Sequence, residues 1–141
     1  MEVEIKFKKL KEDATIPKYA HEGDAGLDIF SNEELKLQPG ERKLISTGIA
    51  AELPRGYAVL IWDKSGVANS GIKTMGGVID CHYRGEYKII MYNTSSEIYE
   101  IKKGQKIAQA LIQPVVSAKV IEAQELSDTE RGEGGFGSTG L

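Results

Sequence analysis

The stretch Gly76-Gly-Val-Ile-Asp-Cys-His-Tyr-Arg-Gly-Glu86 places a carboxylate and an aromatic ring between an apolar triplet and a turn signal. Asp80 follows the triplet directly, and Tyr83 lies three residues further along the chain. Arg84-Gly85 marks a turn, because glycine adopts backbone conformations that other residues avoid. The pattern predicts a β-hairpin that carries an acid and a ring.

Short apolar runs with a β-like pattern lie on both sides of this stretch: Val3-Ile5-Phe7, Tyr57-Ala-Val-Leu-Ile-Trp62, Lys88-Ile-Ile-Met-Tyr92 and Ile107 to Ile112. No long stretch repeats apolar residues at helical spacing. Further turn signals separate the runs, at Pro39-Gly40, Pro54-Arg-Gly56 and Lys103-Gly104. We therefore predict an all-β fold, an antiparallel sandwich or barrel, with one short helix after Ser65.

Length and charge limit the class of protein. The chain of 141 residues is long enough for one domain with its own core, and its net charge of −3 gives no basic field for nucleic acid or membrane headgroups. The single cysteine, Cys81, cannot form an intrachain disulfide, and no apolar run approaches the length of a membrane span. We expect a soluble, intracellular, cytoplasmic protein. His21 and His82 lack partners at metal-binding spacing, so no zinc site is expected.

Three polar groups lie within or beside the apolar runs. Asp28 stands between apolar neighbours in a predicted buried strand, where an ionised carboxylate needs a hydrogen bond or a cation. An aspartate in a turn at the strand end is the alternative. Lys64-Ser-Gly66 follows the run that ends at Trp62, and its glycine allows a ligand to approach closely. Gln109 lies in an apolar strand, either as a satisfied core amide or as a ligand.

The chain ends in Arg131-Gly-Glu-Gly-Gly-Phe-Gly-Ser-Thr-Gly-Leu141, which has no apolar period. Its glycines let backbone N–H groups turn toward an anion, Arg131 can grip phosphate, and Phe136 can stack on a base. A solvated linker is the alternative. Composition changes only here, so we predict a folded body over residues 1–128 and an arm over 129–141.

In their order and spacing, these segments resemble the trimeric deoxyuridine triphosphate nucleotidohydrolases, the dUTPase family. The resemblance spans nearly the whole chain, and its most specific parts are Gly77-Val-Ile-Asp80, Tyr83-Arg-Gly-Glu86 and Arg131 to Gly140. It implies a distorted jelly roll of mainly antiparallel strands, assembled as a homotrimer. Each active site would take the hairpin from one chain, the other body motifs from a second and the arm from a third.

The resemblance also implies the reaction, hydrolysis of dUTP to dUMP and pyrophosphate by attack of water on the α-phosphorus. That reaction keeps uracil out of DNA and supplies dUMP for dTMP synthesis. Asp80 would be the general base for the water. Tyr83 would pack on the deoxyribose and exclude a 2′-hydroxyl, while backbone groups of Gly77, Val78 and Ile79 would read the uracil edge.

The remaining motif residues would hold the phosphates. Asp28 would bind Mg²⁺ indirectly, through water. Ser65, next to Gly66, would meet oxygens at the α–β linkage, while Lys64 and Gln109 would steady the phosphate chain. Ser65 and Gln109 are thus predicted to act with Asp80 in catalysis. In the arm, the resemblance implies that Phe136 stacks on uracil and that Arg131, Ser138 and Thr139 contact the outer phosphates. Gly137 is counted with these substrate-binding residues.

Two positions depart from the family pattern. Lys64 stands where the second motif normally has arginine, and lysine lacks the bidentate fork that fixes phosphate geometry. Cys81-His82 replaces a small or acidic residue and, in many members, a second aspartate. We expect His82 on the surface and assign no role to Cys81.

Two other functions share this architecture. The dCTP deaminases have the same roll and trimer but lack the Gly-Phe-Gly-Ser-Thr arm, which this chain contains. A nucleotide-binding regulator is the second alternative, and such proteins usually carry an added segment that is not evident here. The sequence favours the hydrolase.

Overall fold

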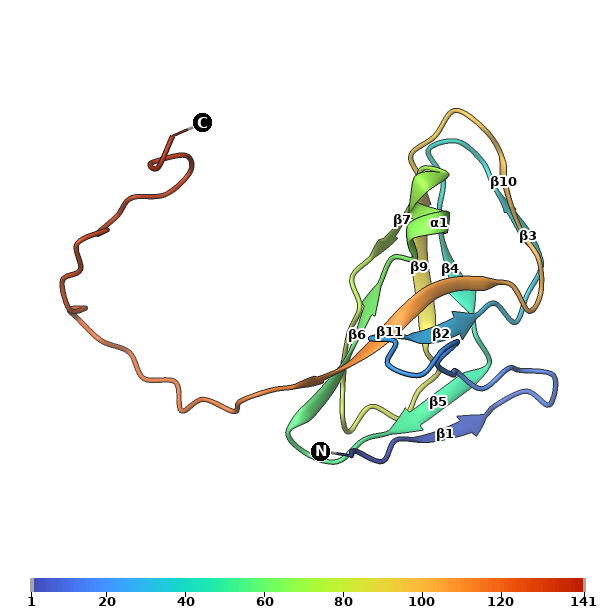
Figure 1. The fold of residues 1–141 in the computed structure, drawn as a ribbon, viewed down its shortest axis with the longest axis horizontal. Coiled ribbons are helices and arrows are strands. Elements are labelled where there is room, and N and C mark those ends of the chain that lie inside the picture. Colours follow the sequence, from blue (N-terminus) through green and yellow to red (C-terminus); the bar gives the residue numbers. More distant parts are fainter. Residues whose placement is uncertain (1, 141) are drawn as a thin grey trace.

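The computed structural model describes residues 2–140, and its regular structure is almost entirely β (Figure 1). The elements in chain order are β1 (Lys6–Lys9), β2 (Leu27–Phe30), β3 (Leu35–Leu37), β4 (Arg42–Ser46), β5 (Ile49–Glu52), β6 (Tyr57–Trp62), α1 (Ser65–Asn69), β7 (Ile72–Met75), β8 (Val78–Asp80), β9 (Lys88–Asn93), β10 (Tyr99–Ile101) and β11 (Lys106–Pro114). The all-β prediction and the short helix after Ser65 are both confirmed.

Every strand pair is antiparallel. A four-stranded sheet has the order β2-β11-β6-β8, a three-stranded sheet has the order β4-β9-β7, and β1-β5 and β10-β3 form two-stranded sheets. Each predicted turn signal falls between two strands. The arrangement is a distorted jelly roll, as expected from the resemblance.

One apolar core lies between the sheets. Ile29, Val59 and Ile107 from the four-stranded sheet and Ile89 and Met91 from β9 are all at most 1% exposed and belong to the same packed cluster. Alternate residues of β9 point into this core, as the period of a half-buried strand requires. In contrast, all four residues of β2 are buried, so the carboxylate of Asp28 lies inside the protein.

The hairpin prediction was wrong in one respect, because β8 and β9 do not pair. Instead β7 pairs with β9, and β8 crosses to the other sheet and pairs with β6. Sequence periodicity predicts a strand but not its partner, so the split was not visible in the sequence. The consequence is that β8 and β9 diverge after the pair Met75↔Ile90.

Two glycines make this crossing possible. Gly76 and Gly77 have φ values of 72° and 113°, in the region that L side chains rarely adopt. A Cβ atom on Gly77 would lie 2.8 Å from Cβ and 3.0 Å from the carbonyl oxygen of Ile61. The carbonyl of Gly77 also accepts a hydrogen bond from the Ile61 N–H at 2.7 Å. The close approach to β6 therefore requires glycine at position 77.

After Pro114 the chain forms no further strand or helix up to residue 140, and Figure 1 shows this segment leading away from the sheets. The sheets thus end before the body–arm boundary predicted at residue 128, and that boundary stays a prediction. Met1 and Leu141, the outer ends of the two predicted units, lie outside the described residues. Within residues 2–140, no helix is long and apolar enough to cross a membrane.

We predict that Gly77→Ala lowers the free energy of unfolding by about 2–4 kcal/mol. Alanine at this position adds the cost of backbone strain at positive φ to the cost of steric overlap with Ile61. Gly40→Ala is the matched control, since Gly40 also has positive φ, 76°, but nothing lies within 4 Å of a Cβ atom there. Urea denaturation at equal protein concentration measures both variants. Equal losses would show that the contact with Ile61 contributes nothing.

Candidate functional site

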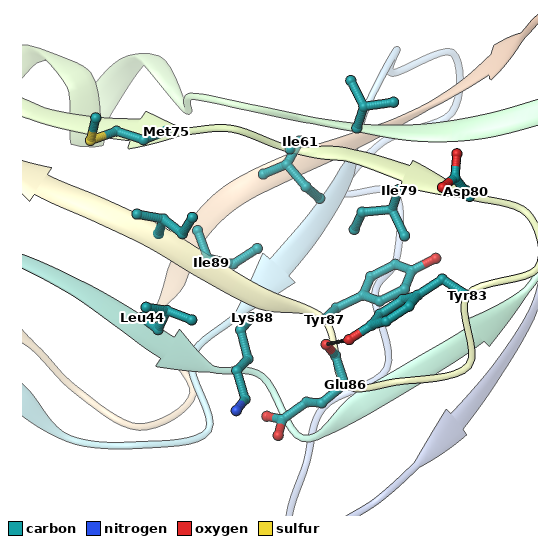
Figure 2. Close-up of a pocket in the computed structure, with 13 residues that line it drawn as sticks. Leu44, Ile61, Met75, Ile79, Asp80, Tyr83, Glu86, Tyr87, Lys88 and Ile89 are labelled. Atoms are coloured by element: carbon teal, nitrogen blue, oxygen red, sulfur yellow. Dashed lines mark hydrogen bonds between the residues drawn. The ribbon is translucent and has the colours of Figure 1, made fainter.

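A cavity of about 480 Å³ opens where β8 and β9 diverge (Figure 2). We call it the hairpin cavity. Its lining includes all five residues of this segment to which the resemblance assigns a role in the active site: Gly77, Val78, Ile79, Asp80 and Tyr83. Apolar side chains of Ile61 and Ile89 also line it, so the cavity combines apolar walls with main chain and two carboxylates, those of Asp80 and Glu86. That composition is typical of a site for a small, partly polar molecule.

Two tyrosine rings form one end of the hairpin cavity (Figure 2). The rings of Tyr83 and Tyr87 stack with their centroids 6.4 Å apart and their planes 22° apart. The Tyr83 hydroxyl donates a hydrogen bond to the carbonyl of Glu86 at 3.1 Å. A Cβ atom on Gly85 would lie 2.2 Å from that hydroxyl, so glycine at position 85 leaves the space that the Tyr83 ring occupies.

Glu86 and Tyr87 anchor this end of the cavity to the β4–β5 turn. The Glu86 carboxylate accepts hydrogen bonds from the Ser46 hydroxyl and from the Gly48 N–H, the latter at 3.0 Å. Tyr87 is 1% exposed, and burial, opposed in part by the charge of Arg84, raises the pKa of its hydroxyl to about 12. Sequence analysis assigned no role to either residue, because their partners lie about forty residues away in the chain.

A second, polar cavity of about 250 Å³ lies where β2, β11 and the end of β6 meet. We call it the polar cavity, and its lining includes Asp24, Gly26, Asp28, Lys64, Ser65 and Gln109. Strand register explains why three separate motifs converge here. Gln109 in β11 lies opposite Asp28 of β2 on one side and opposite Trp62 of β6 on the other, two residues before Lys64.

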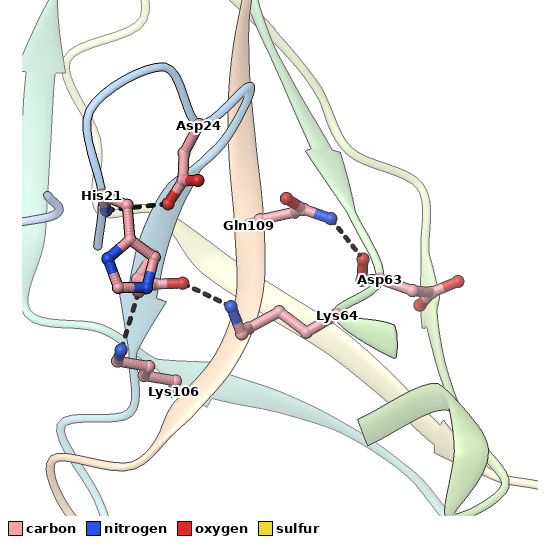
Figure 3. A network of polar contacts seen from close by, with 7 residues as sticks. His21, Asp24, Asp63, Lys64, Lys106 and Gln109 are labelled. Atoms are coloured by element: carbon pink, nitrogen blue, oxygen red, sulfur yellow. Dashed lines mark hydrogen bonds and ion pairs between the residues drawn. The ribbon is translucent and has the colours of Figure 1, made fainter. Parts of the chain in front are cut away.

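Asp28 forms ion pairs with two lysines at the polar cavity, Lys64 and Lys106, which are labelled in Figure 3. Its side chain is 3% exposed, and its two oxygens lie 2.5 Å from Nζ of Lys64 and 3.0 Å from Nζ of Lys106. Burial opposes ionisation, but the two ammonium groups outweigh it and hold the pKa of this carboxyl below its ordinary value. The expectation that Asp28 needs a nearby cation is confirmed, although sequence analysis missed Lys106.

Gln109 reaches the polar cavity because residue 26 is glycine. A Cβ atom on Gly26 would lie 2.4 Å from Oε1 of Gln109. The amide Nε2 of Gln109 donates a hydrogen bond to the carbonyl of Asp63 at 2.8 Å. The amide therefore ties β11 to the residue that precedes Lys64.

The arm residues lie apart from both cavities in this chain. Phe136 is fully exposed with a φ of 50°, and the Arg131 side chain turns back to donate to the carbonyl of Gly134 at 2.8 Å. Backbone hydrogen bonds from Ser138 to Gly135 and from Gly140 to Gly137 form successive turns. The remaining predicted arm positions, Gly137, Ser138 and Thr139, are likewise exposed.

A comparison with protein families decides the relationship: the dUTPase family matches residues 12–140. This chain belongs to the dUTPase family. The deoxyuridine 5′-triphosphate nucleotidohydrolase of Nautilia profundicola is 52% identical over 98% of this chain and 99% of its own length. The enzyme of the same name from Clostridium kluyveri is 50% identical over the same shares of the two chains.

Solved dUTPase structures share the fold. The dUTPase of Staphylococcus bacteriophage 80alpha, solved with dUpNHpp, has a TM-score of 0.92 and 32% identity, covering 98% of this chain and 99% of the phage chain. A mutant dUTPase of phage phi11 of S. aureus, described with a structural Mg(II) ion, has a TM-score of 0.81 and 29% identity. The match covers 86% of this chain and 97% of the phi11 chain.

The positions that depart from the dUTPase pattern differ in their surroundings. Lys64 is 30% exposed in its side chain and engages Asp28, so the ammonium that replaces arginine lies at the polar cavity. His82 is exposed, as expected, and Cys81 is half-buried against the core. Neither Cys81 nor His82 lines the hairpin cavity.

We predict that Asp28 stabilises the folded protein and that this stabilisation is lost in acid. Because its folded-state pKa is lowered, the stabilisation is present above the unfolded pKa, about 3.9, and is lost as pH falls through the folded value. Asp28→Asn should lower the free energy of unfolding by about 1–3 kcal/mol at pH 7, and the difference from wild type should narrow below about pH 4.

Urea denaturation across pH 3–7 measures this difference. Glu100→Gln is the control, since Glu100 pairs with Lys36 on the exposed surface at 3.4 Å and such pairs contribute little. A gap between wild type and Asp28→Asn that stays constant with pH would contradict the prediction.

Proposed function

We propose that this protein hydrolyses dUTP to dUMP and pyrophosphate. One observation carries the proposal: in a chain of the dUTPase family, Gly77, Val78, Ile79, Asp80 and Tyr83 line a single cavity. The relatives at about 50% identity are named for this reaction and match almost the whole chain. The names of these relatives favour the hydrolase over a deaminase.

Asp80 is the proposed general base. Its carboxylate is exposed at the end of β8 and lines the hairpin cavity, so water can reach it. It orients that water toward the α-phosphorus and accepts its proton as the new P–O bond forms and pyrophosphate leaves. A positioned general base contributes roughly 10²–10⁴-fold to a rate.

The main chain of Gly77 to Ile79 and the ring of Tyr83 would select the substrate. The divergence of β8 from β9 leaves main-chain groups of Gly77 to Ile79 free of the β9 ladder, where they can pair with a uracil edge. The stacked ring of Tyr83 gives a flat surface for deoxyribose, and a 2′-hydroxyl would collide with it. A base whose donors and acceptors do not match would leave buried polar groups unpaired, which is strongly penalised.

The polar cavity is the proposed phosphate side of the site. Ser65 and Gly66 are the first two residues of α1, and Lys64 and Gln109 line the polar cavity together with Ser65. In residues 2–140, no group of three acidic, histidine or cysteine side chains that could hold a metal ion occurs. Asp28 would hold Mg²⁺ only through water, because the ammonium groups of Lys64 and Lys106 already contact its two oxygens. When bound, Mg²⁺ neutralises phosphate charge.

A homotrimer would bring these parts together. Within one chain the hairpin cavity and the polar cavity share no lining residue, and the C-terminal segment leads away from the sheets (Figure 1). Val116, Val120 and Leu126, in the segment before the arm, are 95%, 91% and 88% exposed, which is unfavourable in water. Neighbouring chains would cover these side chains and receive the arm, so that Phe136 closes over uracil and Arg131, Ser138 and Thr139 close over the outer phosphates.

The first test is release of pyrophosphate from dUTP, dCTP, dTTP and UTP with Mg²⁺, for wild type and for Asp80→Asn. We expect release from dUTP alone and a fall of about 10²–10⁴-fold in kcat for the variant, because the amide keeps the shape but cannot accept the proton. Binding of dUpNHpp should be retained. Near-wild-type turnover by Asp80→Asn would refute the assignment of the base.

Removal of residues 131–141 tests the arm. We expect the truncated chain to fold and assemble, because no strand extends beyond Pro114, but to lose at least about tenfold in kcat/KM for dUTP. Sedimentation velocity checks the assembly, and steady-state kinetics the activity. Phe136→Ala in the full chain separates loss of base stacking from loss of the whole arm. Normal turnover by the truncated chain would exclude closure by the arm.

A further inference from the structure

Asp63, to which sequence analysis assigned no role, lies beside the polar cavity and is held by contacts from three residues, Thr74, Lys73 and Gln109. It follows β6 directly and precedes Lys64. Its Oδ1 accepts hydrogen bonds from the N–H and from the hydroxyl of Thr74, both at 2.7 Å. Its Oδ2 pairs with Nζ of Lys73 at 2.5 Å. The carboxylate thus fixes the end of β6 to β7.

The main chain of Asp63 is held from a different direction. Its carbonyl accepts the hydrogen bond from Gln109 at 2.8 Å (Figure 3). Gln109 lies in β11 of the four-stranded sheet, whereas Thr74 and Lys73 lie in β7 of the three-stranded sheet. Two sheets therefore hold one residue, β7 through the side chain and β11 through the backbone. The next residue, Lys64, has little freedom to place its Cα elsewhere, and its ammonium meets Asp28 in β2.

The charge of Asp63 is maintained at neutral pH. Its side chain is 22% exposed, and this burial opposes ionisation, but Lys73 and the two donors of Thr74 outweigh it and lower the pKa of the carboxyl. Thr74 is 6% exposed, and its N–H needs an acceptor because a buried donor without a partner is costly. The alternative is that Asp63 serves only to accept the hydrogen bonds of Thr74 and has no effect on Lys64.

We propose that Asp63 is a positioning residue for the phosphate side of the site: its carboxylate, fixed by Lys73 and Thr74, sets where Lys64 meets the substrate. The proposal rests on the proposed function, since Lys64 is assigned there to the phosphates. Lysine offers a compact charge without the fork of arginine, so its position depends more on where the backbone places it. A fixed Asp63 supplies that constraint.

The test compares Asp63→Ala with Asp63→Asn in steady-state hydrolysis of dUTP. Asparagine keeps an oxygen for both donors of Thr74 and loses only the ion pair with Lys73, so its kcat should stay within about threefold of wild type. Alanine loses every side-chain contact, and its kcat should fall about 10–100-fold while KM changes less than about threefold, because misplacement affects the transition state most. A folded Asp63→Ala protein with wild-type kcat would overturn the proposal.

A double-mutant cycle identifies the residue through which Asp63 acts. In a Lys64→Met background, the effect of Asp63→Ala on kcat should shrink to less than about threefold, because the group to be positioned is gone. An undiminished effect would overturn the proposal and leave the structural role. Glu100→Ala, which breaks the exposed ion pair with Lys36, is the matched control and should leave kcat unchanged in both backgrounds.

Two further measurements keep the test decisive. If Asp63→Ala does not fold, Thr74→Val removes one of the two donors to Oδ1 at constant shape and should lower kcat by about threefold, while unchanged kcat would count against the proposal.

A crystal structure of the Asp63 variant that folds reports the position of Lys64 without reference to activity. If wild type does not hydrolyse dUTP, the function fails, and a displaced Lys64 would still support the positioning role whereas an unmoved Lys64 would refute it.

Discussion

The pairing of β11 with β2 on one side and β6 on the other is the contact on which the core and the polar cavity both depend. It buries Ile107 and Ala108 completely and makes β11 the longest strand. The same register sets Gln109 between Asp28 and the end of β6. A shift by one residue would turn the amide into the opposite face and remove Gln109 from the polar cavity, so the core and the site cannot vary independently.

The hairpin cavity depends on a local exception to sheet pairing. Gly76 and Gly77 let the chain leave β9 and continue against β6, and the separation of β8 from β9 creates the space that Ile79, Asp80 and Tyr83 line. A continuous hairpin would have filled that space with a ladder of hydrogen bonds. The main-chain groups that the crossing separates from β9 are the ones that we propose to pair with the uracil edge. One backbone feature therefore provides both the cavity and its polar edge.

The sequence predicted the elements better than their partners. Apolar alternation and glycine-containing turns were sufficient for the all-β fold and for the strands around Trp62 and Ile89, because these signals are local. The demand of Asp28 for a cation followed from the cost of a buried charge, but Lys106 could not be identified without the register of β2 and β11. Asp63 was missed for the same reason, since its partners Lys73 and Thr74 become neighbours only when β6 and β7 are placed.

The charges around Asp28 bear on the proposed role of Lys64, which stands where the family normally has arginine. Lys64 and Lys106 face one buried carboxylate, so the cluster carries excess positive charge before any phosphate arrives. Asp28 holds the Lys64 ammonium at the polar cavity in the empty site, while Asp63 holds its backbone. A side chain fixed at both ends loses little further freedom on binding, which offsets the missing geometric fork of arginine. The substitution is then compatible with a preorganised phosphate site, provided that the residues on either side of it in space remain in place.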